Sequence, residues 1–299
     1  MRVLFLINPA AGKGRAKKAW EKVAPRLKEL GDFDVTYTTA PGEATRLARE
    51  AAHKGYDRVA AVGGDGTMFE VMNGLAGTDA TLAVLPGGTG NDYARCTGLP
   101  VDFYEGGKVA LSGSFRYVDI GRLSSGKHFI SVIGAGFDAE VAANVNRYPK
   151  YFGGTIPYMA GIVKTLWQYT PRDLEIEMDG RRIVRKSLLI AVGLASSYGG
   201  GMKIVPDAKV DDGLFDVCIG GDLGRAEVLG LVPQIYKGTH VNHPKVEMAR
   251  CRHIAIASKQ PTNLQAEGEL IGQLPVEITI LPGHLKLACP QQALAQAAD

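Results

Sequence analysis

Five consecutive residues, Gly63-Gly64-Asp65-Gly66-Thr67, combine residue types that suit phosphate binding. They follow an apolar run at 58–62, which predicts a buried strand, and precede an apolar stripe at 68–75 with the spacing of one helix face. Glycines let backbone N–H groups approach an anion, and a helix N-terminus favours negative charge. A carboxylate in such a turn needs a cation between itself and a phosphate, so Asp65 indicates Mg²⁺ carried by a nucleotide. The alternative is a tight strand-to-helix turn in which Asp65 or Thr67 caps the helix.

Two other loops have a composition that suits anion binding. The segment 86–92 (Pro-Gly-Gly-Thr-Gly-Asn-Asp) follows an apolar run at 81–85, and the segment 8–14 follows another at 3–7. Loops that follow strands of one parallel sheet lie at its carboxyl edge, so we expect the glycine loops to lie near each other there. Lys13 and Arg15 are candidates to face a triphosphate. Neither a Walker A loop nor a G-x-G-x-x-G fingerprint is present.

The N-terminal part alternates between strand-like and helix-like segments. Strands are predicted at 3–7, 33–38, 58–62 and 81–85, and helices at 16–30, 43–54 and from about 68 to 75. This alternation is typical of a parallel sheet with helices on both faces.

After residue 111 the pattern becomes β-rich. Strands are predicted at 117–123, 128–133, 174–178, 182–194, 214–219, 253–258 and 276–281, with helices near 139–146, 156–169 and 226–236. Asp179-Gly180 is a strong hairpin signal. Many strands with few helices predict an antiparallel sandwich or barrel-like second domain. The polar tail at 291–299 is expected to fray.

Composition limits the class of protein. A chain of 299 residues with 45% hydrophobic content is expected to form two domains, and its net charge of +3 gives no reason to expect nucleic acid as a partner. The four cysteines are isolated, which fits a reducing cytosol. The N-terminus lacks the features of a signal peptide, and no apolar run is as long as a membrane span. A lipid substrate would therefore be approached from outside the bilayer.

The motifs together resemble those of the diacylglycerol kinase family of lipid kinases, whose catalytic domain sphingosine and ceramide kinases share. The resemblance rests on Gly63 to Thr67 followed by Glu70-Val-Met-Asn-Gly74, and on Leu85 to Arg95. It extends to Asn8-Pro9…Gly12, Tyr198 to Gly201, Pro206 to Val217 and Glu267-Gly268-Glu269, so it covers nearly the whole chain.

The resemblance implies a Rossmann-like nucleotide-binding domain at 1–120, with 285–299 as a candidate completing segment, and a β-rich lipid-binding domain at 121–284. It implies ATP and Mg²⁺ as cofactors, with Asp65 holding the metal of the nucleotide. The nucleotide contacts that it implies are Asn8, Pro9, Ala10, Ala11, Gly12, Thr38, Gly64, Asp65, Gly66, Thr67, Met68, Phe69, Glu70 and Thr89.

The acid that activates the acceptor hydroxyl in this family belongs to an Asp-Gly-Glu turn. In this chain the turn reads Glu267-Gly268-Glu269, so Glu267 is the expected base and its carboxylate lies one methylene further from the backbone. This departure changes the reach of the base. Glu269 is the competing candidate.

Asp212 belongs to an Asp-Gly turn before a predicted strand, and a role in this turn alone would explain the residue. The resemblance implies a structural Mg²⁺ held by the Asp212 carboxylate and the backbone carbonyls of Lys209 and Leu214, and the two readings are compatible.

The predicted function is an ATP-dependent lipid kinase with a diacylglycerol-like substrate. It is expected in the cytoplasm, transiently at the inner face of the membrane as a peripheral protein, and a homodimer is a candidate assembly. One alternative is a regulator that binds nucleotide or lipid without transfer, which the change at Glu267 favours. Another is an NAD kinase, which shares the first glycine turn.

Overall fold

The computed structural model describes residues 1–112, 114–146 and 155–291. The chain divides into two compact units, Met1–Ile120 with Pro282–Asp299, and Gly121–Leu281. The predicted tail at 292–299 lies outside the described residues.

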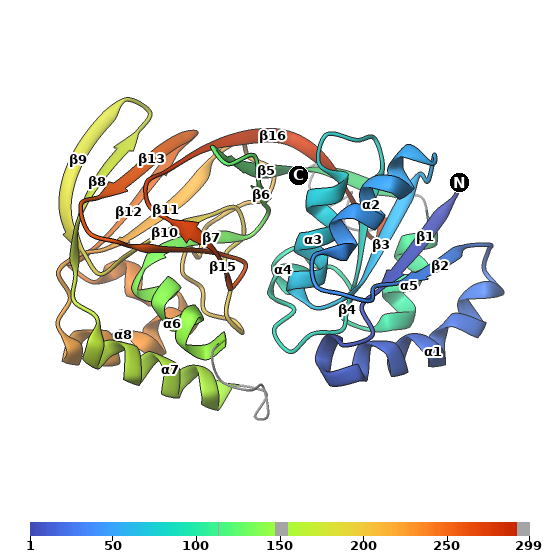
Figure 1. Cartoon of the computed structure of the whole chain (residues 1–299), viewed down its shortest axis with the longest axis horizontal. Coiled ribbons are helices and arrows are strands. Elements are labelled where there is room, and N and C mark those ends of the chain that lie inside the picture. The colour runs from blue at the N-terminus through green and yellow to red at the C-terminus, as the bar shows by residue number, and fades with distance from the viewer. Residues whose placement is uncertain (113, 147–154, 292–299) are drawn as a thin grey trace. The chain divides into compact units, whose positions relative to one another are not determined.

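The first unit is built on a parallel sheet with the order β2-β1-β3-β4 (Figure 1). Its strands are β1 (Val3–Ile7), β2 (Asp34–Tyr37), β3 (Arg58–Gly63) and β4 (Thr81–Pro86). The last part of β16 (Val276–Ala288) adds a further parallel strand, with Leu287 opposite Leu82. The strand order reverses direction between β1 and β3, and ligands bind at such switch points in open α/β sheets.

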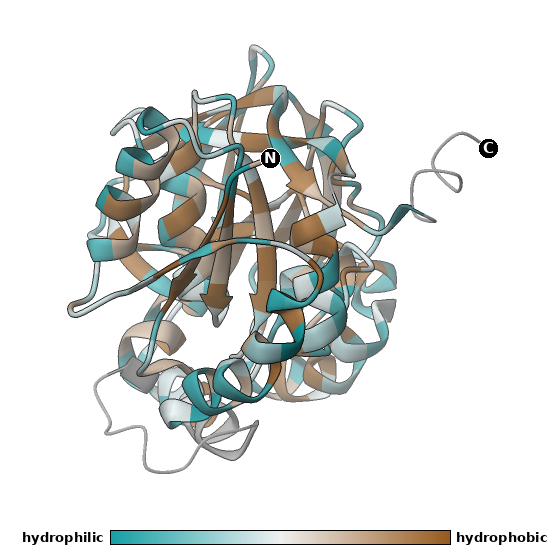
Figure 2. Ribbon diagram, turned by 90° about the vertical axis from the view of Figure 1, so that its right-hand side faces the viewer, coloured by the Kyte–Doolittle hydropathy of each residue, from teal (hydrophilic) through white to brown (hydrophobic). Residues whose placement is uncertain are grey.

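Helices cover both faces of this sheet. They are η1 (Ala11–Gly14), α1 (Arg15–Lys28), α2 (Glu43–His53), α3 (Asp65–Leu75), α4 (Asp92–Cys96) and α5 (Phe103–Ser112). The strands are hydrophobic and the helices carry their hydrophilic residues outward, as Figure 2 shows. Beneath α1, Phe5 lies 4.6 Å from Trp20 and 4.8 Å from Phe33 between ring centroids, which anchors the helix to the sheet.

The second unit contains an antiparallel sheet with the order β12-β11-β10-β7-β14-β15. Its strands are β7 (Val132–Gly136), β10 (Leu189–Gly193), β11 (Phe215–Gly220), β12 (Val246–Cys251), β14 (Asn263–Ala266) and β15 (Glu269–Gln273). A second layer of antiparallel strands joins the first part of β16 to β13 (His253–Ser258), β8 (Arg172–Met178) and β9 (Arg181–Ser187). The connecting strands β5 (Phe115–Leu123) and β6 (His128–Phe129) pair with each other.

Helices also pack on the six-stranded sheet of this unit. They are α6 (Phe137–Asn146), α7 (Thr155–Gln168) and α8 (Arg225–Lys237), and the short η2 (Thr239–Asn242) follows α8. Phe137 of α6, Leu166 of α7 and Leu231 of α8 share an apolar cluster with Leu188 beside β10. No helix in the described residues has the length and apolarity needed to cross a membrane.

Two predicted strands are each divided in the structure. The predicted strand 182–194 is β9 followed by β10, which belong to different sheets, and 128–133 is likewise β6 followed by the start of β7. β9 is largely exposed whereas β10 is almost wholly buried, so the chain changes layers at Leu188. The hairpin at Asp179-Gly180 is confirmed, because both residues have positive φ and the flanking strands pair in register.

Several elements escaped the sequence prediction. They are α4, α5, β12, β14 and β15. Gly106 and Gly107 weaken the helix signal of α5, because glycine disfavours helices. At Gly107 the absence of a side chain allows close packing, since a Cβ there would lie 2.4 Å from Leu27 Cδ1. The strands β14 and β15 are short, Gln265 of β14 is polar but buried, and Leu270 of β15 is apolar but exposed, which weakens the alternation signal.

Candidate functional site

Three loops converge at the carboxyl edge of the parallel sheet in the first unit. The amide of Gly87 donates to the carbonyl of Gly63 at 2.6 Å, which joins the loop after β4 to the end of β3, where the loop after β3 begins. The Asn8 side chain donates to Thr67 Oγ1 at 3.0 Å, which joins the loop after β1 to the start of α3. The expectation that the two glycine loops lie side by side is therefore confirmed.

Glycines make this convergence sterically possible. A Cβ on Gly88 would lie 2.8 Å from the Cα of Gly64, and one on Gly12 would lie 2.4 Å from the carbonyl oxygen of Gly87. Gly12 also has φ of +58°, which side chains disfavour. The backbones thus approach more closely than any side chain allows, and closely spaced backbone loops of this kind suit a compact anion site.

Asp65 lies in the first turn of α3 at the centre of these loops. Its Oδ2 accepts a hydrogen bond from the Asn91 amide at 3.0 Å, and the Asn91 side chain in turn accepts from the Gly88 amide at 2.9 Å. Burial and the nearby Asp92 carboxylate raise the pKa of Asp65 above its ordinary value. A half-buried acid in this setting is stabilised in its ionised form by a bound cation.

Asp92 lies beside Asp65 and is a further candidate site residue, which the sequence motifs did not indicate. A Cβ on Gly90 would lie 3.0 Å from Asp92 Oδ2 and 3.1 Å from Asp65 Oδ2, so the two carboxylates flank this glycine. Oxygen ligands from two carboxylates fit Mg²⁺, which normally keeps several waters. The signal was available in the sequence: each of the two adjacent strands is followed by a glycine loop with its own aspartate.

The other residues expected at the nucleotide differ in their surroundings. Asn8 and Thr67 belong to the converging loops, and the Thr38 amide donates to the Ile7 carbonyl at 2.9 Å at the same edge. Thr89 is exposed in the loop after β4, whereas Met68 is buried in the core. Pro9, Ala10, Ala11, Gly64, Gly66 and Phe69 lie in or directly after the same loops.

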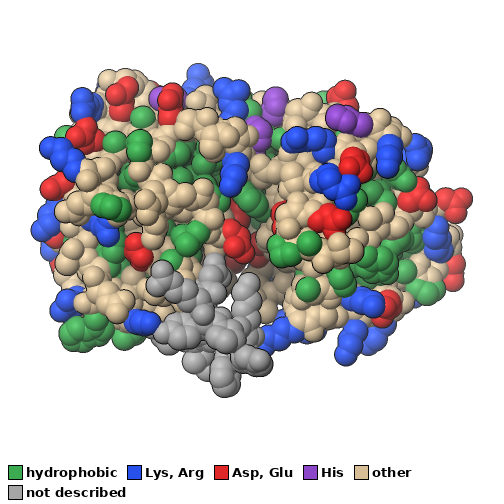
Figure 3. All heavy atoms as spheres, in the orientation of Figure 1, with side chains coloured by type: hydrophobic (Ala, Val, Ile, Leu, Met, Phe, Trp, Pro, Cys, Tyr) green, Lys and Arg blue, Asp and Glu red, His purple; other side chains and the backbone are tan. Residues whose placement is uncertain are grey.

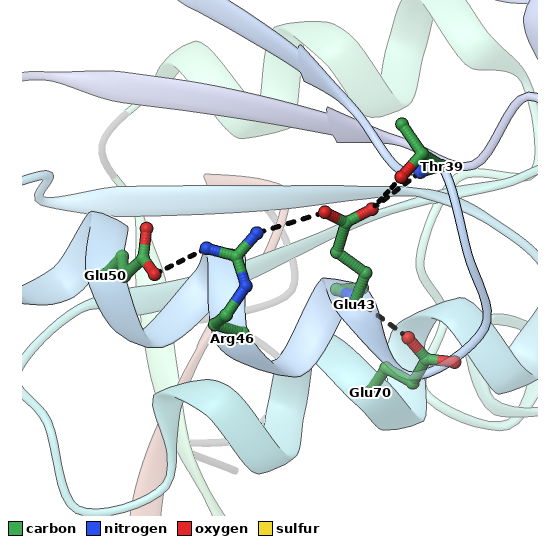
Figure 4. A network of polar contacts seen from close by, with 6 residues as sticks. Thr39, Glu43, Arg46, Glu50 and Glu70 are labelled. Atoms are coloured by element: carbon green, nitrogen blue, oxygen red, sulfur yellow. Dashed lines mark hydrogen bonds and ion pairs between the residues drawn. The ribbon is translucent and has the colours of Figure 1, made fainter.

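Glu70 holds two helices together. Its carboxylate accepts hydrogen bonds from the amides of Gly42 at 2.9 Å and Ala44 at 3.1 Å, at the N-terminus of α2. Glu43 lies beside it and accepts from Thr39, which lowers the pKa of Glu43 to about 2 (Figure 4). The Glu70 carboxylate thus caps α2 and supports the loop that follows β2.

Glu267 lies in the second unit, in the two-residue hairpin turn between β14 and β15. Its Oε1 accepts hydrogen bonds from the amides of Ser131 at 2.7 Å and Ile130 at 3.2 Å, just before β7. The amide of Glu267 donates to the Val132 carbonyl at 3.1 Å. The carboxylate of Glu267 is held in place, whereas Glu269 is exposed at the start of β15.

Asp212 has partners for both carboxylate oxygens. The Leu214 amide donates to Oδ1 at 3.2 Å, and the Arg250 guanidinium pairs with Oδ2. Arg250 also lies 3.5 Å from Asp216. A metal at Asp212 with the carbonyls of Lys209 and Leu214 would compete with this arginine, and that site stays a prediction. No cluster of three or more metal-ligating side chains occurs in the described part of the chain.

Comparisons with known proteins agree with this architecture. Residues 2–123 match the model of the diacylglycerol kinase catalytic domain, and residues 131–289 match that of the YegS C-terminal NAD kinase beta sandwich-like domain. The diacylglycerol kinase of Bacillus subtilis is 32% identical over 302 residues, covering 100% of this chain and 99% of the relative. That of Staphylococcus carnosus is 32% identical over 293 residues, covering 97% and 95%.

Solved structures show the same likeness. One from Bacillus anthracis, described as a diacylglycerol kinase, has a TM-score of 0.74 at 25% identity and covers 98% of each chain. A second from that organism has a TM-score of 0.82 at 27% identity, covering 98% of this chain and 96% of the other. The chain belongs to the diacylglycerol kinase family, whose members are phosphotransferases that act on an alcohol. In the name of the second domain, the words NAD kinase describe the type of β sandwich. The relatives that align over the whole chain are named diacylglycerol kinases.

Proposed function

We propose that this protein transfers the γ-phosphate of ATP to the hydroxyl of a diacylglycerol-like lipid. The observation that carries the proposal is the convergence of three glycine-bearing loops around Asp65, which is the arrangement needed to surround a polyphosphate in a Rossmann-like nucleotide domain. The resemblance of this unit to the catalytic domain of lipid kinases supports the same assignment.

Residues of both units take part in the proposed reaction. The loop amides and the N-terminus of α3 bind and orient the phosphates, and the Glu267 carboxylate accepts the proton of the lipid hydroxyl as its oxygen bonds to the γ-phosphorus and ADP leaves. Mg²⁺, held by Asp65 with Asp92, would neutralise phosphate charge. The residues present fit the metal, because two oxygen ligands flank Gly90 and Asp65 is destabilised as an isolated anion.

The lipid is reached from the aqueous side in this proposal. On α7, Trp167 is 67% exposed and Val163 is 42% exposed, and the Arg225 guanidinium lies 4.9 Å from the Trp167 ring centroid. Aromatic, aliphatic and basic side chains together suit a membrane surface. Elsewhere, on the face drawn in Figure 3, basic and acidic side chains are interspersed. A cytoplasmic protein that attaches transiently to the inner face of the membrane, alone or as a homodimer, fits these features.

The test is transfer of labelled phosphate from ATP to a panel of lipids in mixed micelles, with mass detection of the product. We expect Mg²⁺-dependent labelling of a lipid fraction with diacylglycerol among the best acceptors. NAD is included as an acceptor, and labelled NADP in place of labelled lipid would contradict the proposal.

A non-catalytic regulator is the second candidate, and the longer side chain at Glu267 favours it. Such a protein would bind ATP and Mg²⁺ in calorimetry and label no lipid in the panel. The contacts that hold the Glu267 carboxylate in place favour the enzyme, because a regulator has no use for a positioned base.

A further inference from the structure

Asp138 is a buried acid in the second unit to which the proposed reaction gives no task. It lies in the first turn of α6 and is 5% exposed. Its Oδ1 has no hydrogen-bond partner among the described residues, and burial raises its pKa to about 6. A buried carboxyl group without a cation is costly to retain, which calls for a reason.

Asp138 is connected to the hairpin that carries Glu267. Gln265 on β14 donates from Nε2 to Asp138 Oδ2 at 3.1 Å, and its Oε1 accepts from the amide of Gly268 at 2.9 Å. An ionised carboxylate only accepts hydrogen bonds, so Asp138 dictates which end of the Gln265 amide points toward α6. The oxygen of that amide is thereby directed at the turn.

The neighbouring strand leaves room for this connection. A Cβ on Gly134 of β7 would lie 1.8 Å from Asp138 Oδ2 and 2.9 Å from Gln265 Nε2. Gly134 pairs with Gln265 across the sheet, so the missing side chain creates the space in which carboxylate and amide meet. The Tyr198 hydroxyl, 3.5 Å from Asp138 Oδ2, adds a further donor on the same oxygen.

The turn itself needs to be held. Glu267 has φ of 54° and Gly268 has φ of 81°, the pattern of a type I′ hairpin turn. Asn and Asp tolerate the first of these positions better than Glu, for which left-handed backbone costs about 1–2 kcal/mol. Contacts from outside the turn must therefore select this geometry, and the Gln265–Gly268 hydrogen bond is one of them.

We propose that Asp138 is a positioning residue for Glu267, acting through the Gln265 amide to hold the turn in the geometry that presents the Glu267 carboxylate to the acceptor hydroxyl. This inference rests on the proposed function of Glu267 as the base. If Asp138 only stabilised the start of α6, in whose first turn it lies, loss of Gln265 would leave turnover intact.

The first test removes the connecting amide. In Gln265→Met, which keeps a similar volume, we expect kcat to fall about 10–100-fold, as outer-shell partners typically contribute, with the KM for ATP unchanged. The matched control is Gln273→Met on the same hairpin, where the exposed amide bonds Asn263 instead, and its kcat should equal that of wild type. Wild-type kcat in Gln265→Met would overturn the proposal.

The second test exchanges the polarity of the pair. Gln265→Glu places two carboxylates against each other, and at a pH of about 9, where both are ionised, their repulsion should displace the turn. Adding Asp138→Asn gives the new carboxylate on β14 a donor, while its other oxygen still accepts from Gly268. We expect kcat of the double variant to be at least about tenfold higher than that of Gln265→Glu alone. Equal kcat in the single and double variants would contradict the proposal.

A readout without catalysis separates this inference from the proposed function. Hydrogen exchange of the peptide that contains residues 266–270 should be faster in Gln265→Met than in wild type and unchanged in Gln273→Met. If wild type labels no lipid, the proposed function fails, and this measurement still decides whether Asp138 and Gln265 hold the turn. Unchanged exchange in Gln265→Met would overturn the positioning role even in an active enzyme.

Discussion

At the scale of single residues, the proposed nucleotide site of the first unit depends on Asp65. Its carboxylate is tied to the loop after β4 through Asn91 and lies near Asp92, so it is placed by backbone contacts from two loops. In the proposed reaction such a group is pre-organised for the cation of the nucleotide and would need little rearrangement on binding.

We predict that Asp65→Asn loses about 10³-fold or more in kcat, because the amide is a poor Mg²⁺ ligand and metal stabilisation of phosphate charge is worth several kcal/mol. The fold should persist, since Asn retains an oxygen that accepts from the Asn91 amide. Turnover and circular dichroism of the purified variant provide the check. A folded Asp65→Asn protein with near-wild-type kcat would remove Asp65 from the mechanism.

Asp138 gives a prediction about pH and stability. Its pKa is raised from 3.8 to about 6 by burial. A raised carboxyl pKa stabilises the folded state while the group is protonated, so this contribution is complete below about pH 4 and is lost as the pH rises through about 6. The shift corresponds to about 3 kcal/mol.

Asp138→Asn lacks this titration. The free energy of unfolding of the variant minus that of wild type should therefore increase by about 2–3 kcal/mol between pH values of about 4 and 7. Urea unfolding at a series of pH values measures the difference directly. A difference that does not vary with pH would show that Asp138 titrates normally.

At the scale of elements, the glycine loops depend on backbone approach. We predict that Gly88→Ala lowers ATP affinity about tenfold or more, because a Cβ would lie 2.8 Å from the Cα of Gly64 and force the loops apart. Gly31→Ala is the control, since a Cβ there meets nothing within 4 Å. Calorimetric titration with ATP compares them, and equal affinity would mean that the loops are turns without a phosphate role.

The Asp212 turn gives a prediction about metal. Because Arg250 already pairs with Asp212 and Asp216, the nucleotide-free wild type should change its Tm by less than about 1 °C between EDTA and millimolar Mg²⁺. Arg250→Met should melt lower and gain about 1–3 °C from Mg²⁺. Arg252→Met, with an exposed side chain, is the control. A Tm of wild type that falls markedly in EDTA would instead support a metal at Asp212, Lys209 and Leu214.

The sequence predicted elements best where a single hydrophobic periodicity was bounded on both sides by turn or loop residues. The segments 3–7, 43–54 and 81–85 agree with β1, α2 and β4 to within a residue. It failed where one predicted strand was in fact two strands of different layers, as at β9 and β10, and where glycines packed a helix, as in α5. Local patterns carry no information on which layer a strand joins, because that choice depends on contacts distant in the chain.

The site shows the same limit. Asp65 and Glu267 were predicted from motifs, because their neighbours in the chain belong to the motif. Asp92, Gln265 and Asp138 were not, since their proposed roles arise from contacts across loops and strands. Gln265 and Asp138 are 127 residues apart in the chain, and nothing in either local sequence indicates that they meet.

At the scale of the whole molecule, the proposed reaction uses a nucleotide site in one unit and an acceptor base in the other. The B. subtilis relative aligns over 100% of this chain, so the assignment to the diacylglycerol kinase family covers both units. The remaining choice between kinase and regulator depends on whether Glu267 works as a base despite its longer side chain.

The most direct test is the turnover of Glu267→Gln at saturating ATP with the best lipid of the panel, measured beside ATP affinity. We predict lipid phosphorylation by wild type, a loss of about 10²–10⁴-fold in kcat for Glu267→Gln, and unchanged ATP binding. Glu267→Asp should stay within about tenfold of wild type, and Glu269→Gln should be as fast as wild type. A Glu267→Gln enzyme as fast as wild type would remove Glu267 as the base, and a wild type that binds ATP and Mg²⁺ but phosphorylates no lipid would overturn the proposed kinase function.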